Sequence, residues 1–253
     1  MKIVHATWEQ QNLGVNAYEI FWDAGDTLED YERAERELIN AGGEYFVVKT
    51  PVNRGDLLFG LPRLGYTFVE ALFRIAVERD AYHVPQSIAR FDRGLSVIRR
   101  TEEQELEAVF GRIREGVFKS DRISMDPYFP AEKTATRYIN WSKQMLAQGC
   151  MLFEMMHRED PIGVFIIKRI DEQTVDPVLM GLYNEDQNRG LGTLLHKKTL
   201  DTCFAQNCSR ITSTFVSNNA KILRVYANVG AAITDVLYTY VKHVDAQPEI
   251  RRK

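Results

Sequence analysis

A short stretch with two glycines has the residue types and position of a phosphate-binding site. It consists of Gln187, Asn188, Arg189, Gly190, Leu191 and Gly192. An apolar run of strand length, residues 178–183, precedes it, and apolar residues at helical spacing follow it to about Gln206. Glycines let main-chain N–H groups approach a ligand closely, and the start of a helix attracts an anion. The stretch therefore predicts a strand, a turn and a helix that together cradle a pyrophosphate.

Two better-known phosphate loops do not fit these residues. The dinucleotide fingerprint needs a third glycine, and Leu195 occupies that place. The nucleoside triphosphate loop needs Gly-Lys-Ser/Thr, which is absent here. On these residues alone, a plain turn that uses two glycines for its geometry explains the stretch equally well.

The stretch resembles the Gln/Arg-x-x-Gly-x-Gly/Ala signature of the GCN5-related N-acetyltransferases (GNAT). In that family a strand follows, then an Asn, a Tyr seven residues later and a Gly four residues after it. Here a strand is expected over residues 211–216, and Asn219, Tyr226 and Gly230 follow at that spacing. The resemblance covers roughly residues 163–230. Departures from the family pattern fall at Asn184, Ile222 and Ala231.

The resemblance implies an enzyme that moves an acetyl group from acetyl-CoA to an amine. The amine attacks the thioester carbonyl, an oxyanion forms, and the thiolate leaves. A main-chain N–H near Leu182 or Tyr183 would hold the acetyl oxygen. Tyr226 stands where the family Tyr protonates the thiolate; the alternative is a packing aromatic with a satisfied hydroxyl. The pKa of a thiol is about 8.5 and that of a Tyr about 10, so this proton transfer is nearly balanced.

The same resemblance assigns the other coenzyme contacts. Asn219 would hydrogen-bond the pantetheine arm, with helix capping as an equal alternative. The pyrophosphate would be surrounded by Gln187, Asn188, Arg189, Gly190, Leu191, Gly192 and Thr193. Candidates for the 3′-phosphate are His196, Lys197 and Lys221, each more simply explained as part of a solvated basic face. Candidates for a general base, by position only, are Glu70, Asp126 and Glu154; loss of the proton to water is the alternative.

The elements that position these groups predict an α/β protein with a mixed sheet. Strands are expected near residues 18–22, 44–49 and 66–77, with helices over 28–41 and 57–64 between them. We expect residues 1–95 to form an additional N-terminal α/β domain and residues 96–253 a GNAT catalytic domain. The last strand is expected over 236–241. No internal repeat stands out, although both halves read as similar strand–helix units.

A second resemblance concerns the acceptor. The run Asp126-Pro127-Tyr128-Phe129-Pro130, with Tyr138-x-x-Trp141 after it, is similar to a segment of the dTDP-fucosamine acetyltransferases. This implies a nucleotide-linked amino sugar as acceptor. The N-terminal unit, with Trp8 and Arg54 among its aromatic and charged residues, would form one wall of the acceptor cleft together with residues 126–129. An acetyltransferase for another small amine or a protein N-terminus, and a non-catalytic CoA-binding protein, stay open.

Composition excludes several classes of function. Hydrophobic residues make up 45% and charged residues 26%, and the net charge of −3 argues against a nucleic-acid binder. No apolar run approaches a membrane span of about 18 residues, and the first residues turn polar too soon for a signal peptide, so we expect a cytoplasmic protein. Three scattered cysteines and five isolated histidines predict no metal site. The sequence leaves the oligomeric state open, a homodimer included.

Overall fold

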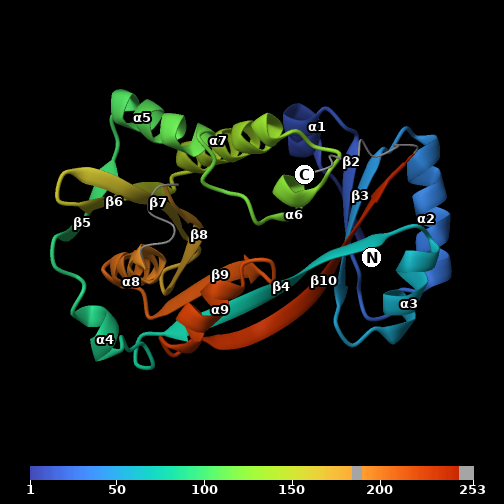
Figure 1. The fold of residues 1–253 in the computed structure, drawn as a ribbon. Coiled ribbons are helices and arrows are strands. Elements are labelled where there is room, and N and C mark those ends of the chain that lie inside the picture. Colours follow the sequence, from blue (N-terminus) through green and yellow to red (C-terminus); the bar gives the residue numbers. More distant parts are fainter. Residues whose placement is uncertain (184–189, 245–253) are drawn as a thin grey trace.

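The computed structural model describes residues 1–183 and 190–244. Ten strands form one mixed sheet in the order β1-β2-β3-β10-β4-β9-β8-β7-β6-β5 (Figure 1). The strands are β1 (Lys2–His5), β2 (Ala17–Phe21), β3 (Tyr45–Pro51), β4 (Thr67–Glu78), β5 (Leu95–Arg100), β6 (Met151–His157), β7 (Asp160–Arg169), β8 (Thr174–Leu182), β9 (Arg210–Val216) and β10 (Ala232–His243). The sheet confirms the predicted mixed α/β class.

Helices cover both faces of the sheet. They are α1 (Thr7–Leu13), α2 (Leu28–Asn40), α3 (Gly55–Arg63), α4 (Gln86–Ala89), α5 (Glu103–Arg114), α6 (Arg122–Met125), α7 (Ala131–Ala147), α8 (Leu191–Phe204) and α9 (Ala220–Ala227). The helices α1, α5, α6 and α7 lie together on one face, while α2 and α3 pack on the other face of the N-terminal half. On that second face α8 and α9 cover the C-terminal half.

The two halves of the chain repeat one unit of structure. In each half a strand, a helix and a second strand form a parallel pair: β2–α2–β3 and β8–α8–β9. A short helix and a long strand follow, α3 and β4 in the first half and α9 and β10 in the second. The turn before the long strand is made by Gly65 at φ +85° and by Gly230 at φ +82°, a conformation that favours glycine.

This repeat was not apparent in the sequence. From β3 and β9 onward the elements of the two halves have matching lengths. β3 and β9 have seven residues each, and the long strands β4 and β10 have twelve each. Few residues coincide along this stretch, among them Asn53 with Asn218 and Gly65 with Gly230. The repeat lies in the backbone path, which glycine turns and strand lengths specify, whereas many different apolar side chains fill the two cores equally well.

The long strands exchange places at the centre of the sheet. β10, from the second half, lies between β3 and β4, and β4, from the first half, lies between β10 and β9 (Figure 1). Because β4 pairs along most of β10, that strand begins at Ala232, earlier than the predicted residue 236. Each half therefore completes the sheet of the other, and residues from both meet around this central pair.

A buried ion-pair network joins the halves on the face of α1, α6 and α7. Glu9, which is fully buried on α1, accepts two hydrogen bonds of 2.7 Å from Arg137 on α7. Arg122 on α6 donates to Glu9 at 3.2 Å and to Glu19 on β2 at 3.0 Å. Lys49 on β3 also donates to Glu19, at 3.2 Å. Buried charges are tolerated only when paired in this way, so the network holds α6 in place.

Candidate active site

A gap opens between the parallel strands β8 and β9. The two strands pair only at Thr174 with Arg210 and at Val175 with Ile211. From there β8 runs on to Leu182 and β9 to Val216 without further pairing between them. Strand edges left unpaired in this way present main-chain donors and acceptors that an extended ligand can use, as an added strand would. The two strands therefore leave main-chain groups with which an extended ligand can pair.

Of the two residues predicted to hold the acetyl oxygen, Leu182 has its N–H on the gap side. In an antiparallel ladder successive N–H groups point to opposite neighbours. The N–H of Tyr183 donates to the carbonyl of Ile162 on the β7 side, at 3.1 Å. The N–H of Leu182, one residue earlier, therefore points away from β7 and toward the gap, where it is available as a fixed hydrogen-bond donor.

The side chain of Tyr183 has a different partner. Its hydroxyl donates to Glu154, which also accepts from Arg100 and from Arg112, both at 2.9 Å. Glu154 is almost fully buried, and its charge is matched by these donors. A carboxylate held in this way is poorly placed to take a proton from an amine, so Glu154 anchors the end of β8 and is not our choice for the base.

The start of α8 lies at the open end of the gap. Gly190 is its N-cap at φ +77°, and no heavy atom lies within 4 Å of the place where a Cβ would stand. A Cβ on Gly192 would meet Leu182 Cδ1 at 3.7 Å, which places the first turn of the helix beside the end of β8. The 14-residue helix directs its positive end here. Gln187, Asn188 and Arg189 lie outside the described residues.

Tyr226 is buried on α9, beneath α8 and beside β9. Its ring stacks on Phe215 with centroids 5.4 Å apart and meets the ring of His196 edge to face at 5.5 Å. Its hydroxyl shares a hydrogen bond with Ser213 on β9. Burial raises the pKa of Tyr226, so the hydroxyl keeps its proton at neutral pH. Asn219 is the N-cap of α9, and its side chain makes no capping hydrogen bond.

The basic residues proposed for the 3′-phosphate differ in burial and in ion pairing. His196 is buried, and burial lowers its pKa to about 4, so it is neutral. Lys197 pairs with Asp92 at 3.0 Å and with Asp201 at 2.6 Å. Lys221 on α9 faces a cavity beside Gly190, together with Arg224, which the sequence reasoning missed. The spacing of these two cations, one helical turn apart, was the available signal.

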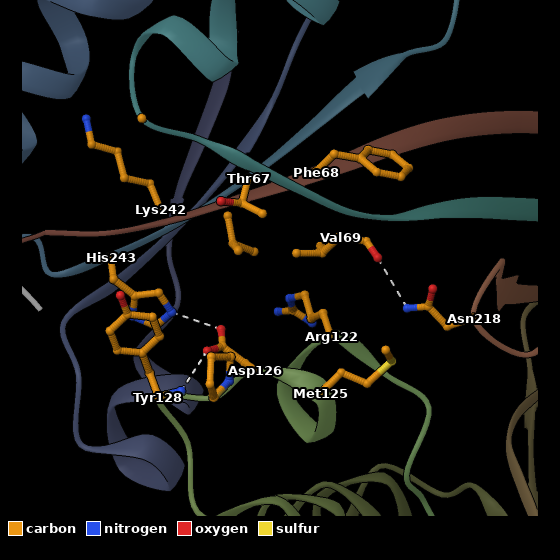
Figure 2. Close-up of a pocket in the computed structure, with 13 residues that line it drawn as sticks. Thr67, Phe68, Val69, Arg122, Met125, Asp126, Tyr128, Asn218, Lys242 and His243 are labelled. Atoms are coloured by element: carbon orange, nitrogen blue, oxygen red, sulfur yellow. Dashed lines mark hydrogen bonds and ion pairs between the residues drawn. The ribbon is translucent and has the colours of Figure 1, made fainter. Parts of the chain in front are cut away.

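A second cavity, of about 400 Å³, lies where the two halves meet (Figure 2). Its wall consists of Gly65, Thr67, Phe68, Val69, Arg122, Met125, Asp126, Pro127, Tyr128, Asn218, Val241, Lys242 and His243. Asn218, two residues after the end of β9, donates to the carbonyl of Val69 on β4 at 3.3 Å. The cavity therefore extends from the end of β9 to the far end of β10.

One side of this cavity carries a hydrogen-bonded pair of titratable side chains. Asp126 and His243 lie 2.8 Å apart, and the ring of His243 stacks on Tyr128 at 3.9 Å (Figure 2). His243 sits at the end of β10, and sequence spacing gave no hint that it would meet Asp126. Arg54, by contrast, is bonded to Asp56 and does not line the cavity; Trp8 does not either.

Glu70, the remaining candidate base, lies beneath the cavity wall. It is buried on β4, and burial raises its pKa to about 7. Among the described residues, one of its carboxylate oxygens has no hydrogen-bond partner, and the same is true of the Nε of Arg122. Glu70 does not line the cavity, whereas Asp126 does. Across residues 1–183 and 190–244, no group of His, Cys, Asp and Glu side chains could hold a metal ion, and no helix is long and apolar enough to cross a membrane.

Part of the chain matches a known protein family. Residues 120–231, which hold β8, α8, β9 and α9, match the model of the "Acetyltransferase (GNAT) family". The search of curated proteins found no match.

Similar solved structures span both halves. A GCN5-related N-acetyltransferase from Kribbella flavida is 14% identical with a TM-score of 0.56, covering 89% of this chain and 80% of its own. A tandem GNAT protein from the clavulanic acid biosynthesis pathway is 13% identical with a TM-score of 0.57, covering 92% and 77%. A glucosamine N-acetyltransferase region of a fungal multi-domain GH3 β-N-acetylglucosaminidase is 11% identical with a TM-score of 0.64, covering 95% and 31%. At these identities the likeness concerns the fold alone. The family match identifies a GNAT acetyltransferase domain over residues 120–231, and on that ground the chain is an acyl-CoA-dependent N-acetyltransferase, an enzyme that transfers an acetyl group from acetyl-CoA to an amine.

Proposed function

We propose that this protein acetylates the amino group of a nucleotide-linked amino sugar, as the resemblance to the dTDP-fucosamine acetyltransferases implies. The cavity between the halves carries the proposal. Its volume, about 400 Å³, lies in the range of small-molecule sites. A sugar ring offers hydroxyls for Asp126 and a C–H face for the ring of Tyr128. The run 126–130, on which the resemblance rests, supplies part of the wall.

In this proposal the coenzyme enters the gap between β8 and β9 with its pyrophosphate at the start of α8. The N–H of Leu182 holds the acetyl oxygen and stabilises the negative charge that develops there. Asn219, whose amide makes no capping bond, binds the pantetheine arm. In this proposal the acceptor amine approaches the carbonyl carbon from the side of Asn218, the cavity residue that follows β9.

The reaction needs two proton movements. The attacking nitrogen forms the new C–N bond and loses a proton, and the C–S bond breaks to leave a thiolate. Tyr226 gives its proton to that thiolate. Burial raises the pKa of Tyr226, and a thiol held in an equally buried place would have a raised pKa as well. Asp126 is our choice to receive the amine proton, directly or through water, because it lines the cavity.

A screen of acceptors tests the proposal. Purified protein is mixed with acetyl-CoA and with aminodeoxy nucleotide sugars, free aminosugars, small amines or peptides with free N-termini, and free thiol is measured. We expect the highest kcat/KM with a nucleotide-linked amino sugar. A higher value with a peptide or a simple amine would reject the sugar acceptor. No thiol release with any amine, despite tight binding of acetyl-CoA, would favour a non-catalytic binder.

A further inference from the structure

The acceptor cavity, of about 400 Å³ between the two halves, has three side chains in its wall that can carry a positive charge: Arg122, Lys242 and His243. Two of them have a carboxylate of their own. Lys242 pairs with Glu35 at 2.9 Å, and His243 pairs with Asp126 at 2.8 Å. Arg122 differs from both, because the carboxylates that it contacts are shared with other cations.

Arg122 belongs to a buried network in which cations outnumber the carboxylates that bind them. Arg122 and Arg137 share Glu9, and Arg122 and Lys49 share Glu19. Three cations are therefore held by two carboxylates, which leaves one positive charge without a bonded counterion. A buried charge without a partner is costly, so the network favours an anion nearby. Arg122 is the member of this network that lines the cavity.

The guanidinium of Arg122 has donors left for such an anion. Its Nη2 donates to Glu9 at 3.2 Å and to Glu19 at 3.0 Å. An arginine has five N–H groups, so those on Nε and Nη1 remain. Neither of these nitrogens has a hydrogen-bond partner among the described residues. Figure 2 shows Arg122 near the middle of the cavity wall, between Asp126 and Asn218 in that view.

The nearby carboxyl groups leave these donors open. Glu70 on β4 lies close enough to feel the charge of Arg122, but it forms no ion pair within residues 1–183 and 190–244. Burial raises the pKa of Glu70 to about 7, so this group is only about half ionised at neutral pH. Asp121, the N-cap of α6, accepts from the main-chain N–H groups of Ile123 and Ser124. The open donors therefore remain for a group that enters the cavity.

We propose that the amine acceptor carries an acidic group, a phosphate or a carboxylate, which the free N–H groups of Arg122 bind. This rests on the proposed use of the cavity for the acceptor. Arginine presents several donors in a plane to either group, and hydrogen bonds between two charged partners are the strong ones. A nucleotide-linked amino sugar supplies a phosphate, whereas an amino acid supplies a carboxylate. Arg122 thereby selects acidic acceptors over neutral amines.

Two pairs of acceptors test the inference, and the members of each pair differ in the acidic group. The first pair is an amino sugar 1-phosphate and the methyl glycoside of the same sugar. The second pair is an amino acid and its amide. Release of free thiol from acetyl-CoA gives kcat/KM for each, and we expect a preference of about tenfold or more for the acidic member of at least one pair.

The outcomes of this comparison separate the inference from the proposed function. A preference in the sugar pair assigns the group to a phosphate and supports both. A preference in the amino-acid pair alone assigns it to a carboxylate and rejects the sugar acceptor. Transfer to both sugars at equal kcat/KM, with no preference in the other pair, would overturn the inference alone. Absence of transfer to all four acceptors would overturn both.

Two arginine variants separate recognition from folding. Arg122→Lys keeps a positive charge for Glu9 and Glu19 but loses the planar set of donors, so the preference for the acidic acceptor should fall about tenfold. Arg137→Lys weakens the same network at Glu9 without lining the cavity. Both variants should lose stability in urea, but the preference should be unchanged in Arg137→Lys. An unchanged preference in Arg122→Lys, or an equal loss in both variants, would overturn the role of Arg122.

A second pair of variants gives the answer even where Arg122→Lys does not fold. Met125 lies one helical turn after Arg122, lines the same cavity and is 58% exposed, so the fold tolerates a polar side chain there. Met125→Glu adds a negative charge beside the proposed anion and should reduce the preference about tenfold, whereas the neutral Met125→Gln should not. Equal preferences in these two variants would contradict an acidic group at this wall.

Discussion

The replacement Tyr226→Phe separates a catalytic hydroxyl from a structural one. The hydroxyl is buried and shares a hydrogen bond with Ser213, which is itself buried. Losing that bond and leaving Ser213 without this partner costs about 1 to 3 kcal/mol of folding stability, whatever Tyr226 does in the reaction. If Tyr226 also protonates the thiolate, kcat falls by roughly 10²-fold or more, which is a barrier increase of about 2.7 kcal/mol.

The matched control is Ser213→Ala, which removes the same hydrogen bond and leaves the Tyr proton in place. We expect similar losses of stability in the two variants, measured by urea denaturation, and a large loss of kcat only in Tyr226→Phe. Affinity for acetyl-CoA, measured by calorimetry, should change little in either variant. Thiol release must be limited by chemistry, which is shown by a rate that depends on the pKa of the acceptor amine. An unchanged kcat in Tyr226→Phe, or an equal fall in both variants, would refute the catalytic role.

Three further predictions concern the ion-pair network, a buried histidine and the acceptor cavity. Glu9→Gln leaves two buried arginines without a full countercharge, so it should lower the free energy of unfolding by about 3 to 5 kcal/mol and Tm by roughly 6 to 20 °C. The control Glu107→Gln, in an exposed ion pair, should lower the free energy of unfolding by less than about 1 kcal/mol. Equal effects of the two variants would contradict the role of burial. The pKa of His196 is lowered from 6.5 to about 4 in the folded protein, so the unfolded chain binds more protons between these values and stability should fall by about 3 kcal/mol as pH drops from 7 to 4. The stability of His196→Phe, measured by denaturation at each pH, should lack this loss of about 3 kcal/mol. A pH profile identical to that of the unmodified protein would refute the assignment to His196. Asp126→Asn should lower kcat with the amino-sugar acceptor roughly tenfold or more and leave the Kd of acetyl-CoA unchanged, because it removes the carboxylate proposed as base from the acceptor cavity. A change in acetyl-CoA affinity, or an unchanged kcat, would contradict this assignment.

The sequence by itself determined the local elements on which the proposed coenzyme site rests. A strand, two glycines and an amphipathic helix in series can be read from short-range periodicity, because each depends on residues only a few positions apart. The spacing from Asn219 to Tyr226 and Gly230 also lies within one helix and one turn. The order of strands and helices in the N-terminal half, up to the strand predicted over 66–77, was likewise predictable from alternating patterns and glycine stops.

Only the tertiary structure decided which distant side chains meet. Pairing of β4 with β10 brings His243 to Asp126, and no local pattern specifies that neighbour. Asp92 neutralises Lys197 and so leaves Lys221 as the accessible lysine beside Gly190, although both are plain surface cations in the sequence. The physical reason is that strand pairing and ion pairing depend on through-space geometry between segments far apart in the chain, whereas helices, strands and glycine turns are specified by neighbours along it.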